Sequence, residues 1–155
     1  LGVAWVDNFE MVIADIPGLI EGAHEGTGLG DRFLKHVERC AAFLHIVDAT
    51  VEDVVNEYHV IRRELELYDG ILMKKPEVIA LNKCDSLLSE EVEKKVKAME
   101  KAVGHKVYAM SAIAKQGIFD CLLDLNQYIT RDRLQKNKQE VEEQEDGALK
   151  TWSPA

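Results

Sequence analysis

Polar segments with the chemistry to bind a nucleotide directly follow three apolar runs of the sequence. They are Asp15-Ile16-Pro17-Gly18, Asn82-Lys83-Cys84-Asp85 and Ser111-Ala112-Ile113. In open α/β sheets, ligands bind at the carboxyl ends of the strands, so binding side chains are expected at these positions. The three segments are therefore the candidate binding site.

The segment from Asn82 to Asp85 has the chemistry to select guanine. The Asp85 carboxylate only accepts hydrogen bonds, so it can pair with the N1–H and 2-amino donors of guanine, a pair that adenine does not offer. The Asn82 amide can bridge the base N7 to neighbouring loops, and the aliphatic stem of Lys83 can lie across the ring with its ammonium near the ribose. Asn and Asp are also common turn residues, so this segment alone leaves an ordinary turn open.

The other two segments add contacts that gain meaning from their positions. A tight turn at Ser111-Ala112 could aim the Ala112 backbone N–H at the guanine O6, which accepts a hydrogen bond where adenine carries an amino donor. Asp15 can hold a water of a Mg²⁺ ion, and the Gly18 N–H can approach a γ-phosphate oxygen and let the following loop move when that phosphate leaves. In isolation, Asp15 to Gly18 also reads as a strand end with a Pro-Gly turn.

Short β-rich runs predict the strands that position these segments. Residues 3–6 and 11–14 read as an antiparallel hairpin with residues 7–10 as its turn. The compact apolar runs at 42–47, 78–81 and 107–110 are typical of strands buried on both faces of a parallel sheet.

Apolar residues at helical spacing predict helices between the strands. One has Val54, Tyr58, Ile61, Leu65 and Tyr68 on one face and a Thr50 cap with Asp53 three positions later. A second helix, started by Ser89 and stopped by Gly104, has Val92, Val96, Met99 and Val103 on one face. A third has Ile118, Leu122, Leu125 and Ile129 on one face. A shorter helix is expected around Phe33, Leu34 and Val37. The alternation predicts a doubly wound, mostly parallel α/β sheet with right-handed crossovers.

Composition limits the other properties of the chain. Its 155 residues suit one globular domain, expected over residues 1–130, and residues 131–155 are read as a charged, disordered tail. The net charge of −9 argues against general attraction to nucleic acid, and the absence of a long apolar run argues against a membrane span. We expect a cytoplasmic monomer whose cysteines at positions 40, 84 and 121 are buried, reduced thiols.

Together the three segments resemble the GTPase superfamily, and residues 15–30, DIPGLIEGAHEGTGLG, resemble the switch II region of the Obg family in particular. The resemblance covers about residues 1–130. It implies that the three segments bind GTP or GDP, that Asp15 serves Mg²⁺, and that a ribosomal particle or rRNA is the partner of the full-length protein. It also implies hydrolysis of GTP to GDP with a conformational readout by switch II, in ribosome assembly.

Two departures from a standard GTPase limit these expectations. Leu19 follows Gly18, where Ras-like enzymes place a Gln that orients the attacking water, so no catalytic residue is assigned and hydrolysis is expected to be slow. Glu21, His24 and Glu25 are the nearby polar residues, and each reads first as a solvated loop residue. The sequence also contains no G-x-x-x-x-G-K-[ST] loop, which holds the phosphates in this superfamily.

We therefore interpret the sequence as a GTPase domain cut just after switch I, inactive by itself and without micromolar affinity for GDP. The resemblance implies a further strand between the hairpin and residues 42–47, whose loss would leave an interior edge unpaired. A nucleotide-free interaction module that uses the Gly-rich loop, with Gly22, Gly26, Gly28 and Gly30, for docking remains the alternative. An unrelated doubly wound fold such as a receiver domain would leave Asn82 to Asp85 unexplained.

Overall fold

The computed structural model describes residues 1–15, 39–68 and 72–151. The strands are β1 (Gly2–Val6), β2 (Phe9–Ile13), β3 (Phe43–Asp48), β4 (Glu77–Asn82) and β5 (Val107–Ala109). The helices are α2 (Val54–Tyr68), α3 (Ser89–Val103) and α4 (Ile118–Thr151), with single 3₁₀ turns η2 (Leu72–Lys74) and η3 (Cys84–Ser86). Ile16, Pro17 and Gly18, the rest of the Gly-rich loop and the predicted short helix near Phe33 lie outside the described residues.

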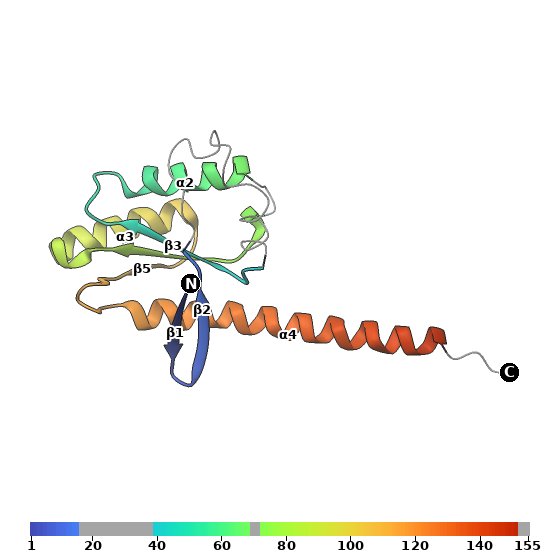
Figure 1. Ribbon diagram of the computed structural model, residues 1–155. Helices are drawn as coiled ribbons and strands as arrows, with labels where there is room; N and C mark the ends of the chain where they lie inside the picture. The colour runs from blue at the N-terminus through green and yellow to red at the C-terminus, as the bar shows by residue number, and fades with distance from the viewer. Residues whose placement is uncertain (16–38, 69–71, 152–155) are drawn as a thin grey trace.

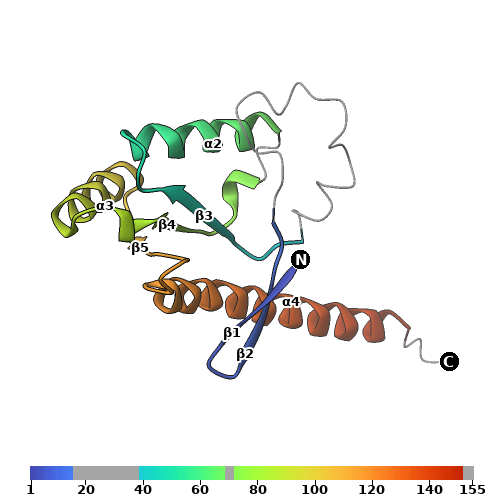
Figure 2. The same cartoon turned by 60° about the vertical axis from the view of Figure 1, so that its left-hand side comes forward.

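A parallel sheet of order β3-β4-β5 lies between two layers. Helices α2 and α3 cover one face, and α4 lies with the β1-β2 hairpin on the other (Figure 1, Figure 2). The alternation of β4 explains both layers, because Ile79 and Leu81 pack toward α2 and α3 while Val78 and Ala80 pack toward the hairpin and α4. The predicted α/β fold is confirmed.

Strand β3 is less enclosed than β4. Ile46 is 49% exposed, so the expected burial on both faces holds for β4 and fails for this part of β3. Among the described residues β3 pairs only with β4, which agrees with the open edge expected beside this strand. Asp48, placed after the strand by the sequence pattern, is its last residue.

The β1-β2 hairpin turns more tightly than predicted. Val6 pairs with Phe9, so the turn has only two residues, and Phe9 and Glu10 belong to β2. Asp7 has φ 53°, the left-handed conformation that two-residue hairpin turns require and that Asp tolerates. Val6 and Met11 point into the core beside α4, and Arg133 of α4 lies 5.0 Å from the centre of the Phe9 ring.

The helix boundaries confirm some sequence signals and correct others. Asp53, not Thr50, caps α2, because its Oδ1 accepts hydrogen bonds from the backbone N–H groups of Val55 (3.1 Å) and Asn56 (3.0 Å). Helix α3 begins at Ser89 and ends at Val103, and Gly104 follows it as the predicted glycine stop with φ 80°.

Helix α4 runs past the point where the ordered part was expected to end. It continues to Thr151, so residues 131–151 are helical in this structure, and the disordered tail stays a prediction. Residues 133–141 are exposed, as expected for a solvated segment, and Lys136 pairs with Asp132 one turn earlier at 2.7 Å. A domain boundary near residue 130 stays a prediction.

The structure agrees in part with the expectation that the cysteines are buried, reduced thiols. All three cysteines are free; Cys121 is buried, whereas Cys40 and Cys84 are only partly so. Burial raises the pKa of Cys121 to about 11, so it is an inert thiol at neutral pH. Within residues 1–15, 39–68 and 72–151, no helix combines the length and apolar character that a bilayer span needs.

Candidate functional site

The structure brings two of the three candidate segments together at the carboxyl end of the parallel sheet. Strands β4 and β5 end side by side, and the Met110 N–H donates to the Leu81 carbonyl at 2.8 Å. Asn82, predicted to follow the strand, is the last residue of β4, and its Oδ1 accepts a hydrogen bond from the Ala112 N–H at 3.0 Å. The Cys84 N–H donates to the Met110 carbonyl at 3.2 Å. The two segments therefore form one continuous surface.

The segment from Asn82 to Asp85 turns sharply after β4. Lys83 has φ 65°, a left-handed conformation that is uncommon for a residue with a long side chain, and the single turn of η3 follows it. Asp85 is exposed, so its carboxylate is open to a ligand. Cys84 faces inward, where its Sγ lies 3.2 Å from the Leu81 carbonyl and burial raises the pKa of the thiol. Cys84, one of the predicted binding residues, therefore supports the turn by its inward contact.

The second loop is built as a closed turn with its tip exposed. Ser111 and Gln116 exchange two backbone hydrogen bonds of 2.9 and 3.0 Å, and the buried Ser111 Oγ accepts one from the Ala114 N–H at 3.0 Å. A Cβ at Gly117, where φ is 69°, would lie 2.2 Å from the carbonyl oxygen of Ala109. These constraints place Ala112 and Ile113 at the tip, where Ile113 is 88% exposed.

The hydrogen bond between Ala112 and Asn82 bears on how the base would bind. The amide hydrogen expected to reach the guanine O6 is already donated to Asn82 Oδ1 in this structure. A bound base would have to share or replace that bond. The Asn82 side chain does link neighbouring loops, and the base contacts of Asp85 and Ala112 stay predictions.

A residue that the sequence analysis did not select, Asp48, lies in the same surface. Its Oδ2 is 2.6 Å from Lys83 Nζ, and its Oδ1 accepts hydrogen bonds from the Thr50 N–H at 2.9 Å and Oγ–H at 2.7 Å. The hydrogen bonds from Lys83 and Thr50 lower the pKa of Asp48 to about 2. Asp48 follows an apolar run in the sequence, so the rule that selected the other segments also applied to it.

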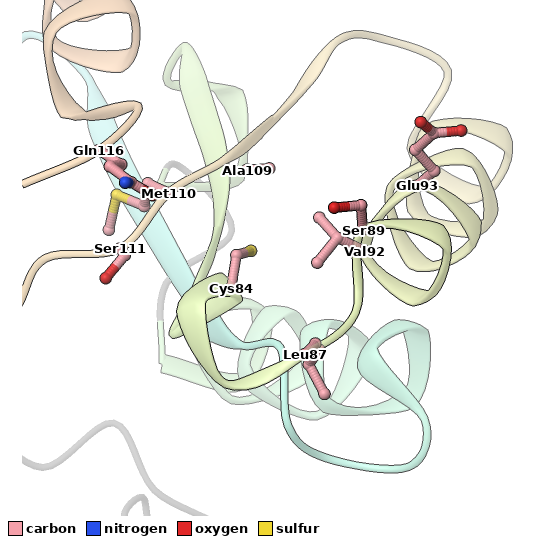
Figure 3. Close-up of a pocket in the computed structure, with 9 residues that line it drawn as sticks. All are labelled: Cys84, Leu87, Ser89, Val92, Glu93, Ala109, Met110, Ser111 and Gln116. Atoms are coloured by element: carbon pink, nitrogen blue, oxygen red, sulfur yellow. The ribbon is translucent and has the colours of Figure 1, made fainter. Parts of the chain in front are cut away.

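An open pocket of about 310 Å³ adjoins the two loops that follow β4 and β5. Cys84 and the end of β5 line one side, and Ser89, Val92 and Glu93 of α3 line the other (Figure 3). The lining includes Cys84 and Ser111 but neither Asp85 nor Ala112. Asp85 and Ala112, the groups predicted to contact the base, therefore do not line this pocket, although their neighbours Cys84 and Ser111 do.

Asp15 lies at the end of the hairpin, two residues after β2, and is exposed. Among the described residues, no hydrogen bond or ion pair joins it to the loops that follow β4 and β5. No cluster of three potential metal ligands is present in the described ranges. A single exposed carboxylate fits Mg²⁺, which keeps several waters and is held through one or two carboxylates and the substrate's phosphates.

The fold and the site together define the class of the protein. A doubly wound sheet with Asn-Lys-x-Asp after one strand and a Ser-Ala turn after the next has the arrangement expected of a GTPase domain. A family model described as 50S ribosome-binding GTPase matches residues 2–83, more than half of the chain. The chain belongs to this family and, by its relatives, to the Obg type of GTPase.

Those relatives are bacterial proteins named GTPase Obg. The chain is 51% identical over 118 residues to that of Rickettsia conorii (strain ATCC VR-613 / Malish 7), and 50% identical over the same length to those of Rickettsia massiliae and Rickettsia felis. Each match covers 76% of this chain and 36% of the relative. The chain thus spans about a third of the length of the curated relatives it matches.

Proposed function

We propose that this chain recognises the guanine base of GTP and GDP in a cytoplasmic, monomeric GTP hydrolase of the Obg type. The hydrogen bond from the Ala112 N–H to Asn82 Oδ1 carries the proposal, because it joins the two loops that must act on one base. The backbone bond from Cys84 to Met110 fixes the same two loops a second time.

Each exposed group of this surface has a role in base recognition. The Asp85 carboxylate accepts from N1–H and the 2-amino group, and the Ala112 N–H moves from Asn82 to the guanine O6. The stem of Lys83 lies along the ring and its ammonium reaches the ribose. Adenine fails at both ends of this edge, because it presents an amino donor where O6 would be and lacks the 2-amino group.

Magnesium and the Gly-rich segment extend the proposal to the phosphates. Mg²⁺ would neutralise the charge of the phosphate groups, and Asp15 would hold one of its waters. Residues 16–30 would report the γ-phosphate to a ribosomal particle during ribosome assembly. Leu19 has no polar atom with which to orient a water, so hydrolysis should be slow.

Replacing Asp85 with Asn tests the proposal through base preference. Xanthine carries an oxo group where guanine has its 2-amino group. The amide of an Asp85→Asn variant can donate a hydrogen bond to that oxo group. The same variant no longer offers guanine a charged acceptor. In the intact protein that carries this chain, affinity for GDP should fall about tenfold to a hundredfold, the range for a lost hydrogen bond to a charged group. Affinity for xanthosine diphosphate should rise.

The control for this experiment is Asp132→Ala, which removes an exposed carboxylate from α4 and should leave both affinities unchanged. If the unaltered protein binds GDP and ADP equally, or if Asp85→Asn leaves the preference between guanine and xanthine unchanged, the proposal is wrong. Complete absence of nucleotide binding would favour the interaction module.

A further inference from the structure

We propose that Asp48 is a positioning residue for nucleotide binding, which holds Lys83 in the direction that the base and ribose require. The inference rests on the proposed guanine-binding function and adds a residue from a third strand to the site. Asp48 ends β3 and lies directly beside Asn82 in the parallel register of β3 and β4. It therefore sits at the same edge of the sheet as the residues that contact the base.

Both oxygens of Asp48 are engaged, and each has a different task. Oδ1 accepts the two hydrogen bonds from Thr50, which fix the carboxylate on its own loop. Oδ2 is left to face Lys83 Nζ at 2.6 Å. A carboxylate fixed at one oxygen and paired at the other defines where the ammonium of a flexible lysine lies.

The loop that carries Asp48 is itself tied down. Lys95 of α3 donates from Nζ to the Ala49 carbonyl at 2.9 Å and to the Val51 carbonyl. The Ala49 N–H donates to the Asn82 carbonyl at 2.8 Å, and Ala49 is fully buried. Asp48 thus stands on a rigid support, as a residue that orients another one must.

Energetics indicate that this ion pair contributes little to folding. Its side chains are 58% and 33% exposed, and an exposed ion pair adds little to stability. The benefit lies in ligand binding, because a free lysine side chain loses rotamer entropy when a ligand fixes it, and Asp48 has already fixed it. Lys83 also keeps a left-handed backbone, a strain that clusters at functional sites.

The chain contains a closely matched control pair. Lys136 and Asp132 on α4 are 2.7 Å apart, and their side chains are 57% and 31% exposed. The two pairs agree in chemistry, distance and exposure. The Lys83 pair differs in its place at the carboxyl end of the sheet and in the two hydrogen bonds that Thr50 donates to its carboxylate. Because the ion pairs are alike, a difference in GDP binding between the variants is not due to ion-pair strength.

The test compares Asp48→Ala with Asp132→Ala in the intact protein. Asp48→Ala should weaken GDP binding about fivefold, the upper range for loss of an exposed pair, and Asp132→Ala should leave it unchanged. Urea denaturation should show a small loss of stability for Asp132→Ala and a somewhat larger one for Asp48→Ala, which also removes the two hydrogen bonds from Thr50. A much larger loss of stability for Asp48→Ala would indicate a structural role and contradict the inference.

A double variant shows whether Asp48 acts through Lys83. If it does, adding Asp48→Ala to Lys83→Ala should weaken GDP binding no further than Lys83→Ala alone. Losses that simply add, or tighter binding by Asp48→Ala, would overturn the inference. In the Asp85→Asn background, Asp48→Ala should weaken xanthosine diphosphate binding by the same factor, because Lys83 contacts parts that both bases share.

These readouts separate the two proposals. If Asp85→Asn changes the base preference and Asp48→Ala leaves affinity unchanged, the guanine site stands and the role of Asp48 is wrong. If Asp85→Asn leaves the preference unchanged, the proposed function itself fails.

Discussion

The two ends of strands β3 and β4 carry charges in opposite settings. At the carboxyl end, Asp48 and Lys83 form an exposed pair beside the candidate site. At the amino end, Glu77 lies under α2 with its side chain only 7% exposed, and His45, Tyr58 and Arg62 surround it. The same two strands thus carry an exposed ion pair at one end and a buried carboxylate at the other. Because the two ends differ in burial, mutations at the buried end should cost more stability.

The buried cluster is held by several contacts to a single carboxylate. Glu77 Oε1 is 2.8 Å from His45 Nδ1, while Oε2 accepts a hydrogen bond from the Tyr58 hydroxyl at 3.0 Å and lies 3.4 Å from Arg62 Nη1. Burial by itself would raise the pKa of Glu77, yet His45, Arg62 and Tyr58 together hold it below its usual value. Burial, and then the negative charge of Glu77, raises the pKa of Tyr58 to about 12.

The largest effect is expected from removing the buried carboxylate. Glu77→Ala should lower the free energy of unfolding by about 3 to 5 kcal/mol, because it leaves the Arg62 charge without its buried partner. Urea denaturation of the purified chain measures this directly. Glu93→Ala, which breaks an exposed pair with Lys97, should cost less than about 0.5 kcal/mol. If Glu77→Ala and Glu93→Ala lower the free energy of unfolding equally, the buried carboxylate is not more important for stability than an exposed one.

Gly117 marks a rigid point at the carboxyl end of the sheet, and Gly104, after α3, provides the comparison. Gly117→Ala should destabilise the chain by more than about 2 kcal/mol, because left-handed backbone costs roughly 1 to 2 kcal/mol and the new Cβ would overlap the Ala109 carbonyl. Gly104→Ala has a similar positive φ with open space around it, so it should lose only the backbone part, about 1 kcal/mol. The two unfolding curves check this, and identical losses would contradict a tightly built turn.

Acid should act first on the buried end. The pKa of Glu77 is lowered in the folded chain, so its stabilising contribution is complete above its ordinary value of 4.5 and is lost as the pH falls below it. The pKa of Asp48 falls from 3.8 to about 2, so the Asp48 contribution is lost only at lower pH. A Glu77→Gln variant should therefore show a flatter dependence of its urea midpoint than the unaltered chain as the pH falls below 4.5. Parallel curves would show that Glu77 does not carry this dependence.

Sequence patterns predicted the elements better than their ends. Short β-rich or compact apolar runs identified the described strands, and the 3.6-residue period identified the described α-helices, because buried faces require these patterns. The 3₁₀ turns η2 and η3 were not predicted. The hairpin turn and the α2 cap were misplaced, since Thr50 and Asp53 are both capping residue types and only their contacts decide between them. Helix α4 continues past the end of its apolar stripe, where pairs one turn apart such as Asp132 and Lys136 support a polar helix.

The sequence by itself determined which groups are available at the carboxyl ends of the strands: an acceptor at Asp85, a backbone donor at Ala112 and a long cationic stem at Lys83. Only the tertiary structure decided how they are held. Lys83 meets Asp48 across 35 positions, and Ala112 meets Asn82 across 30. Parallel strands bring such distant residues to one edge through their register, and register depends on how whole faces pack together, which no short segment of sequence specifies.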